Sequence, residues 1–313
     1  MSDSGPFLVL HIGKTGGTAL KGGYIAENYA PDEVLIDLST NEQMEAACKL
    51  LDGMTPEQRN NLKFVHGHLL KSVAGYFEGG RLITVIRRPE SHVVSQYFHK
   101  KYATLEQGQP HNLELNEEGL GIIEAADRFN MFNSQTVGIA RFFDIDPQSI
   151  SVEDIPDLLD RFLLVGLTEK LQAFVYYLHK AYGCILAPVE QRNSRSELVN
   201  QFIPQRVIKE IQKRSALDIA LYEEAERRFD TLFEGILTTL PDEDHEWNAF
   251  REMVQDVHAM RLNENAELLQ KFEVMNKEVA NVIAQIHAAN ALVAQKDQEL
   301  QQLRVMLKRK AGL

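Results

Sequence analysis

The sequence is poor in cysteine, has no long apolar run and has no excess of positive charge, and each absence excludes a class of protein. Its 313 residues include only two cysteines, Cys48 and Cys184, which excludes a disulfide scaffold and a four-thiolate zinc site. So few thiols fit a reducing compartment. No run of 18 apolar residues is present, so no membrane-spanning helix is predicted. The net charge of −12 disfavours a general nucleic-acid binder, which needs a positive face.

The composition is otherwise that of a folded protein, with 44% hydrophobic and 25% charged residues. The first six residues contain no basic side chain, so we expect no secretory signal. The pattern changes near the acidic stretch 241–246. We therefore predict two domains, residues 1–240 and residues 241–313.

In the first domain, short apolar runs alternate with helical patterns. Strands are predicted at residues 7–12, 33–38, 63–68, 81–87 and 162–167. Helices are predicted at residues 18–29, 41–52, 56–61, 89–101, 117–128, 130–142 and 169–182. The polar stretch 104–116 is predicted to be a surface loop. Such alternation is typical of the α/β class, with a parallel sheet flanked by helices.

The second domain shows a sustained seven-residue repeat. Eleven of its twelve stripe positions are apolar, and Lys296 is the exception. The stripe consists of Leu268, Phe272, Met275, Val279, Val282, Ile286, Ala289, Val293, Lys296, Leu300, Leu303 and Leu307. This repeat predicts a coiled coil and hence a homo-oligomer, without distinguishing a dimer from a trimer. The alternatives are a helix that folds back on the first domain, or one that binds another protein.

The most informative motif is HIGKTGGT, residues 11–18, which follows a predicted strand and opens a predicted helix. Glycines let backbone N–H groups converge, the helix N-terminus favours an anion, and Lys14 adds a full positive charge. The motif therefore predicts a phosphate or sulfate site. It differs from the nucleotide-triphosphatase loop, because Lys14 precedes the glycines, and the strand 81–87 offers no acidic partner for magnesium. The alternative is an ordinary glycine-rich turn.

Two further motifs lie at predicted strand ends. Arg87 ends a strand directly before the helix that Pro89 opens, and Ser95 follows two helical turns later. A planar guanidinium at the carboxyl edge of the sheet suits a phosphate, whereas a surface cap is the alternative, above all for Arg88. His66 and His68 face the same way if their strand continues, and either is a candidate general base. A metal pair and a buried core histidine are the alternatives.

In this order, these motifs resemble those of the 3′-phosphoadenosine 5′-phosphosulfate (PAPS)-dependent sulfotransferases. The resemblance is to the carbohydrate branch typified by heparan sulfate 2-O-sulfotransferase. Four blocks carry it, namely HIGKTGGTA, FVHGHL, VIRRPESHVVSQYF and FLLVGLTEKLQAFVYYL. It covers about residues 7–235 and implies the sulfotransferase fold. The chain departs from the family at Gly13, where proline is usual, and at Arg88, where an acidic residue is common.

The resemblance also implies the site residues. Lys14 would contact the bridging oxygen of PAPS, residues 15–18 would surround its 5′-phosphate, and Arg87 with Ser95 would hold its 3′-phosphate. A later basic loop, residues 192–195, would cover the nucleotide. The full set of implied donor contacts is Lys14, Thr15, Gly16, Gly17, Thr18, Arg87, Ser95, Arg192, Ser194 and Arg195.

The implied activity is transfer of a sulfuryl group from PAPS to an acceptor hydroxyl, expected on a saccharide (EC class 2.8.2). His66 or His68 would be the base, Lys14 would stabilise the leaving group, and no metal is expected. Animal relatives are anchored in the Golgi membrane, whereas this chain has no predicted span, so a cytoplasmic enzyme is implied. Two alternatives remain: a nucleotide kinase with an atypical phosphate loop, and a non-catalytic coiled-coil scaffold.

Overall fold

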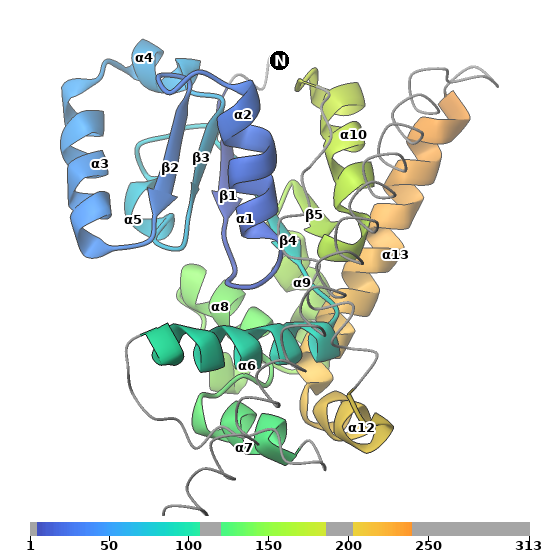
Figure 1. Ribbon diagram of the computed structural model, residues 1–313. Helices are drawn as coiled ribbons and strands as arrows, with labels where there is room; N and C mark the ends of the chain where they lie inside the picture. The colour runs from blue at the N-terminus through green and yellow to red at the C-terminus, as the bar shows by residue number, and fades with distance from the viewer. Residues whose placement is uncertain (1–4, 107–119, 186–202, 240–313) are drawn as a thin grey trace, which may run out of the picture. The chain divides into compact units, whose positions relative to one another are not determined.

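The computed structural model of the protein describes residues 5–106, 120–185 and 203–239 (Figure 1). The chain divides into two units, Met1–Asp244 and His245–Leu313, and all described residues belong to the first. The predicted coiled coil and the basic loop 192–195 lie outside the described residues. None of the helices in the described part is long and apolar enough to span a membrane.

A five-stranded sheet forms the centre of the first unit (Figure 1). The strands are β1 (Phe7–Leu10), β2 (Val34–Leu38), β3 (Phe64–Gly67), β4 (Arg81–Ile86) and β5 (Leu164–Leu167). Their order is β2-β3-β1-β4-β5, and every neighbouring pair is parallel. The α/β class with a parallel sheet is therefore confirmed. All carboxyl ends of the strands meet at one edge, the usual place for a ligand in such a sheet.

Helices connect the strands. They are α1 (Gly17–Leu20), the π-helix η1 (Lys21–Ile25), α2 (Ala26–Asn28), α3 (Asn41–Gly53), α4 (Pro56–Asn61), α5 (Lys71–Ala74), α6 (Pro89–Glu106), α7 (Leu120–Arg128), α8 (Ser134–Phe142), the 3₁₀ turns η2 (Pro147–Ser149) and η3 (Val152–Asp154), α9 (Ile155–Leu159), the 3₁₀ turn η4 (Thr168–Lys170), α10 (Leu171–Tyr182), α12 (Gln205–Arg214) and α13 (Ala216–Thr239). Capping boxes at Thr40 and Thr55 satisfy the first amides of α3 and α4.

Both faces of the sheet are buried, as near-continuous apolar strands require. Side chains alternate across β1, so Leu8 and Leu10 belong to one core cluster while Phe7 and Val9 belong to the other. The first cluster includes residues of α3, α5 and α9, and the second includes residues of α1, η1 and α10. The helices thus flank the sheet on both faces.

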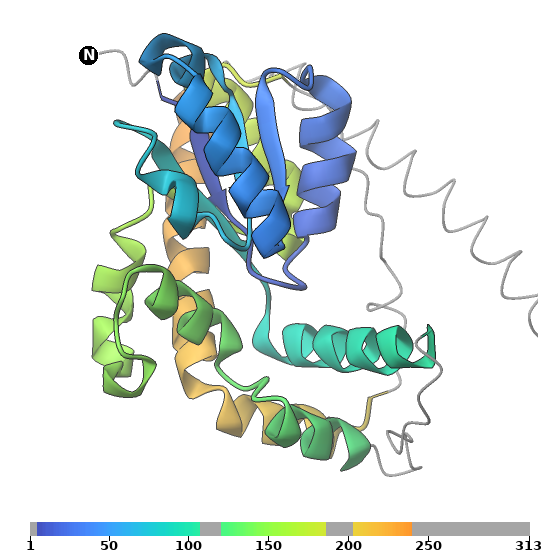
Figure 2. The same ribbon diagram turned by 90° about the vertical axis from the view of Figure 1, so that its left-hand side faces the viewer.

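A third core cluster positions α6 at the carboxyl edge of the sheet. Val94 and Tyr97 of α6 pack with Ile122 of α7 and with Val207 and Ile211 of α12. The three helices lie together beyond the ends of the strands (Figures 1 and 2). One face of α6 is therefore held by apolar burial, which leaves other positions of the helix available to the ligand edge.

Two predicted helix boundaries differ from the structure by about a full helical turn. The helix predicted over 130–142 begins only at Ser134, because Asn130 and Asn133 adopt positive φ angles of 50° and 53°. The helix predicted over 89–101 continues to Glu106, so the first residues of the predicted loop 104–116 are helical. The rest of that loop lies outside the described residues.

Candidate active site

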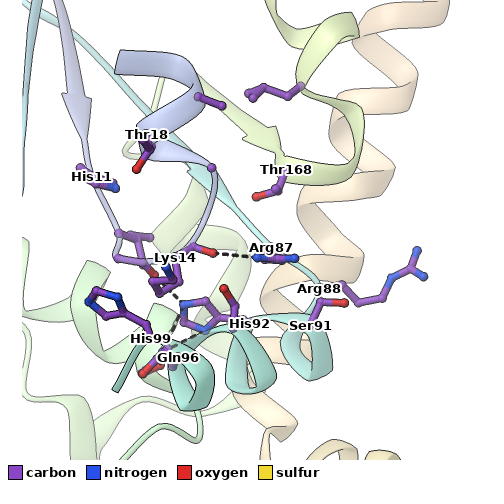
Figure 3. A pocket seen from close by; sticks show the side chains of 18 of the residues that line it. His11, Lys14, Thr18, Arg87, Arg88, Ser91, His92, Gln96, His99 and Thr168 are labelled. Atoms are coloured by element: carbon purple, nitrogen blue, oxygen red, sulfur yellow. Dashed lines mark hydrogen bonds between the residues drawn. The ribbon is translucent and has the colours of Figure 1, made fainter. Parts of the chain in front are cut away.

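A cavity of about 690 Å³ opens at the carboxyl edge of the sheet. The loop between β1 and α1 forms one side of it, and α6 forms the other (Figure 3). The described lining residues are His11, Ile12, Gly13, Lys14, Gly16, Gly17, Thr18, Ala19, His68, Arg87, Arg88, Ser91, His92, Ser95, Gln96, His99, Lys100, Ser134, Thr168, Glu169 and Leu171. This size matches that of small-molecule and cofactor sites.

Side chains hold the carbonyl oxygens of the loop in place. The Ile12 carbonyl accepts a hydrogen bond from the Thr15 hydroxyl at 2.8 Å, and the Gly13 carbonyl accepts one from His92 at 2.8 Å. The Lys14 carbonyl accepts one from Arg87 at 3.3 Å, and the Thr15 carbonyl accepts one from Thr168 at 2.8 Å. The last three donors belong to α6, the end of β4 and η4. Four consecutive peptide groups are therefore oriented by three other segments of the fold as well as by the loop itself.

The orientation of these carbonyls leaves a row of backbone donors. The described peptide bonds are all trans, so each amide N–H points away from the carbonyl of its own peptide group. The amides of residues 13–18 have no hydrogen-bond acceptor within the described part of the chain. Several unsatisfied amides at the start of a helix form an anion site.

Lys14 and Gly16 give the loop its tight curve. Lys14 has a φ of 69° and Gly16 a φ of 85°, both in the left-handed region. This conformation costs a lysine about 1–2 kcal/mol, whereas glycine adopts it freely. Burial, and next the Arg87 guanidinium, lower the pKa of Lys14 below its usual value. A bound anion would relieve this crowding of positive charge.

The Arg87 backbone is fixed by a buried amide. Gln135 of α8 accepts from the Arg87 N–H and donates to its carbonyl, both at 2.8 Å. The buried Asp218 of α13 accepts from the N–H groups of Gln135 (3.3 Å) and Thr136 (2.8 Å). Asn133 accepts in return from the Asp218 N–H at 3.1 Å. These reciprocal caps hold the start of α8 against α13 and thereby fix the position of Arg87.

The structure separates the two predicted histidines. His66 lies in β3 and is only 1% exposed, whereas His68 is exposed and lines the cavity. The strand ends at Gly67, where a side chain would lie 2.3 Å from Leu38, so the predicted alternation does not extend to His68. His68 is therefore the member of the pair available to a substrate.

His11 is a site residue that the sequence analysis did not select. Its ring stacks on that of His68 at 4.1 Å and lies 4.8 Å from that of His66. Burial, and next the charges of His66 and His68, lower its pKa to about 2. Its Nε2 would be 1.9 Å from a Cβ atom at Gly17. The glycine that the motif predicted for anion binding also makes room for this ring.

The helix side of the cavity also holds residues that the sequence analysis did not select. They include His92, Gln96, His99, Lys100 and Ser91 of α6, together with Ser134 at the start of α8. The first three are spaced i, i+4 and i+7, which places them on one face of a helix. The sequence could have predicted that these residues line the site, because Ser95 on the same helix was already expected to face it.

The lining is positively charged although the whole chain is acidic. Lys14, Arg87, Arg88 and Lys100 line the cavity, and Glu169 is the only acidic side chain among its described lining residues. Glu169 already accepts hydrogen bonds from the Arg88 N–H (3.1 Å) and a tyrosine hydroxyl (3.3 Å). Within the described residues, no group of three His, Cys, Asp or Glu side chains is arranged to hold a metal ion. The cavity therefore suits an anion.

Most of the predicted donor contacts meet at this cavity, namely Lys14, Gly16, Gly17, Thr18, Arg87 and Ser95. The Thr15 side chain does not line it. Its buried hydroxyl donates to the Ile12 carbonyl, so Thr15 offers a ligand only its amide. Arg192, Ser194 and Arg195 lie outside the described residues.

Comparison of the chain with models of known protein families finds no match. Comparison with curated proteins likewise finds no match. The function must therefore be argued from the site itself.

Proposed function

We propose that the protein is a PAPS-dependent sulfotransferase with the sulfotransferase fold, which sulfates an acceptor hydroxyl on a saccharide. The observation that supports this most directly is the pairing of two anion-binding elements in one cavity. The amides of residues 13–18 form one element, and the Arg87 guanidinium forms the other. PAPS has anionic groups at two separated positions, so its chemistry matches such a pair. The proposal includes the coiled-coil tail as the homo-oligomerisation element.

The donor would lie along the loop and the start of α6. The amides of residues 15–18 would bind the 5′-phosphate, and Lys14 would contact the oxygen that bridges phosphorus and sulfur. Arg87 would hold the 3′-phosphate through its planar fork, and Ser95 would add a hydroxyl donor. Both side chains of this second group line the cavity, from the end of β4 and from α6.

The transfer step moves one sulfuryl group and one proton. The acceptor oxygen forms a bond to sulfur while the bond from sulfur to the bridging oxygen breaks. His68 takes the acceptor proton, and Lys14 stabilises the charge that develops on the departing phosphate oxygen. His68 suits this role because it is exposed to the cavity, whereas His66 is buried in β3. His11 suits it poorly, since a pKa of about 2 makes it a weak proton acceptor.

The lining favours this donor over a nucleoside triphosphate. A sulfuryl group carries less charge than a terminal phosphate, so fixed cations and amides can balance it. A magnesium-dependent kinase would use carboxylates near the phosphates. The single carboxylate in the described lining, that of Glu169, is engaged with Arg88 and a tyrosine. We therefore rank the kinase below the sulfotransferase.

A thermal-shift measurement with adenosine 3′,5′-bisphosphate tests the proposal. At 100 times its dissociation constant, a ligand of the native state adds about 2.7 kcal/mol to the free energy of unfolding. Transfer from radiolabelled PAPS to a panel of saccharides then tests the reaction, with magnesium and ATP as the comparison. A melting curve that adenosine 3′,5′-bisphosphate leaves unmoved, together with turnover of ATP, would contradict the proposal.

A further inference from the structure

His92 of α6 lies at the cavity beside the phosphate loop, with its side chain only 1% exposed. Its Nε2 atom is 2.8 Å from the Gly13 carbonyl oxygen (Figure 3). A carbonyl only accepts, so Nε2 must carry the proton and donate. The proposed function gives this residue no part, since it holds no donor group and takes no proton.

The neighbours of His92 fix its ring in the neutral, Nε2-protonated form. The Gln96 amide nitrogen lies 3.2 Å from each ring nitrogen of His92 and 2.8 Å from the Ser134 hydroxyl oxygen. The Ser134 hydroxyl donates in turn to the Met131 carbonyl at 2.9 Å. Because Nε2 carries the hydrogen that it donates to the Gly13 carbonyl, only Nδ1 can accept from Gln96, whose other amide hydrogen goes to Ser134. The donations in this chain diverge from Gln96, toward the Met131 carbonyl on one side and toward the phosphate loop on the other.

The bond to Gly13 acts on the most strained residue of the loop. The two peptide groups that flank Lys14 determine its φ and ψ. His92 holds the carbonyl of the first group, and Arg87 holds the carbonyl of the second at 3.3 Å. A lysine with a φ of 69° persists only when its surroundings enforce that conformation. Loss of either bond frees a peptide group to rotate and turns an amide away from the cavity.

We propose that His92 is a positioning residue that holds the phosphate loop in its anion-binding conformation through the Nε2–H bond to the Gly13 carbonyl. It acts through the amides of the loop and does not touch the anion. The inference rests on the proposed function only for the identity of the anion, adenosine 3′,5′-bisphosphate or PAPS. The geometry applies to any phosphate or sulfate group at this loop.

The test uses the full-length protein and three variants. His92→Phe keeps a ring of similar size but has no donor, and His92→Gln places an amide N–H near the position of Nε2. His179→Phe is the matched control, because His179 Nδ1 also donates to a backbone carbonyl, that of Cys184 at 2.7 Å, away from the cavity. Calorimetric titration with adenosine 3′,5′-bisphosphate gives the affinity, and thermal melting gives the stability.

We expect His92→Phe to weaken binding about tenfold or more, which corresponds to one buried hydrogen bond. His92→Gln should restore binding to within about threefold of the wild-type protein, since the donor is restored. His179→Phe should lower the melting temperature without changing the affinity. A purely structural role predicts instead that affinity follows stability in all three variants.

Two outcomes would overturn the inference. One is wild-type affinity in folded His92→Phe, and the other is a His92→Gln variant that binds as weakly as His92→Phe. If the wild-type protein fails to bind the probe, the proposed function fails. A crystal structure of ligand-free His92→Phe then decides the inference separately. A Lys14 φ that returns to negative values supports it, and an unchanged loop refutes it.

Discussion

The two sides of the cavity present different parts of the chain to a ligand. The loop side, residues 11–18 with His68 beside it, offers mainly backbone amides, and its shape depends on Lys14 and Gly16 at positive φ. The helix side, Arg87 to Lys100, offers side chains on regular backbone that Pro89 opens. The loop side therefore depends on shape and on small residues, whereas the helix side depends on which side chains it presents.

The two sides also support each other. His92 and Arg87 belong to the helix side, yet each holds a carbonyl of the loop. Variants on the helix side can therefore act at a distance, through the loop. Substitutions that affect one side but spare the other test how far the two are separable.

The largest expected effect is on kcat, and it distinguishes two exposed histidines, one on each side of the cavity. His68→Ala should lower kcat about 10²- to 10⁴-fold, because it removes the proposed base from the loop side. His99→Ala, which removes an exposed imidazole that lines the helix side, should leave kcat within about a factor of five. Steady-state rates with radiolabelled PAPS measure both. The reverse order of effects would move the base to α6.

The next effect distinguishes binding from turnover. Arg87→Ala should weaken adenosine 3′,5′-bisphosphate binding about 10- to 100-fold, because charge-assisted bonds to a phosphate are strong. Lys14→Ala should instead lower kcat more than affinity, since its contact strengthens as the phosphate oxygen leaves. Calorimetry and kcat together separate the two. Full turnover by Lys14→Ala with weakened binding would contradict the roles assigned here.

A smaller effect, on the free energy of unfolding, tests how closely the loop glycines are packed against their neighbours. Gly17→Ala places a Cβ atom 1.9 Å from His11 Nε2, and we expect a loss of about 1–3 kcal/mol in the free energy of unfolding. Gly13→Ala is the matched control in the same loop. Its Cβ would lie 3.8 Å from His68 Cε1, an ordinary contact, so the change should stay within about 0.5 kcal/mol. Urea denaturation measures the free energy of unfolding of both variants. A loss for Gly17→Ala as small as that for Gly13→Ala would mean that the His11 ring moves aside freely.

The last effect is the smallest per step of the measurement, about 1 kcal/mol per pH unit, and it concerns the helix side. Burial lowers the pKa of His92 from 6.5 to about 4. Below pH 6.5 the unfolded chain therefore takes up a proton that the folded protein does not, and stability falls with the pH until about pH 4. From pH 7 to pH 5 this loss amounts to roughly 2 kcal/mol.

His92→Gln should lack this share of the loss, so the free energy of unfolding of the wild-type protein should fall more steeply than that of the variant. The comparison isolates His92 because other groups titrate in both proteins, including Asp218, whose pKa is raised by burial. Urea denaturation at pH 7, 6 and 5 provides the slopes. Parallel slopes would mean that His92 is protonated in the folded state.

Local patterns predicted much of the fold. Short apolar runs located all five strands, and helical patterns located α3 and α4, with Pro56 in the first turn of α4. They failed where the backbone departs from a regular repeat, as at Asn133, whose positive φ delays the start of α8. They also gave no prediction for α9, α12 or α13, because no motif drew attention to those segments.

The candidate site was predictable in its residue types and less so in its geometry. Lys14 and Arg87 were selected from motifs at strand ends, and both line the cavity. The hydrogen bonds that shape the loop were beyond such reasoning, since Thr168 bonds a carbonyl 153 residues away and His92 one 79 residues away. Contacts at such separations depend on the register of the sheet and on the packing of α6.

By itself, the sequence determined the α/β alternation and placed a candidate anion-binding loop and an arginine at strand ends. Those features depend on residues that are neighbours in the chain, where periodicity, glycine and helix ends act directly. Only the tertiary structure decided that His68 faces the cavity while His66 is buried, that the His11 ring stacks on His68, and that His92 bonds to the loop. The reason is that the direction of a side chain is set by strand register and close packing, which join segments far apart in the sequence.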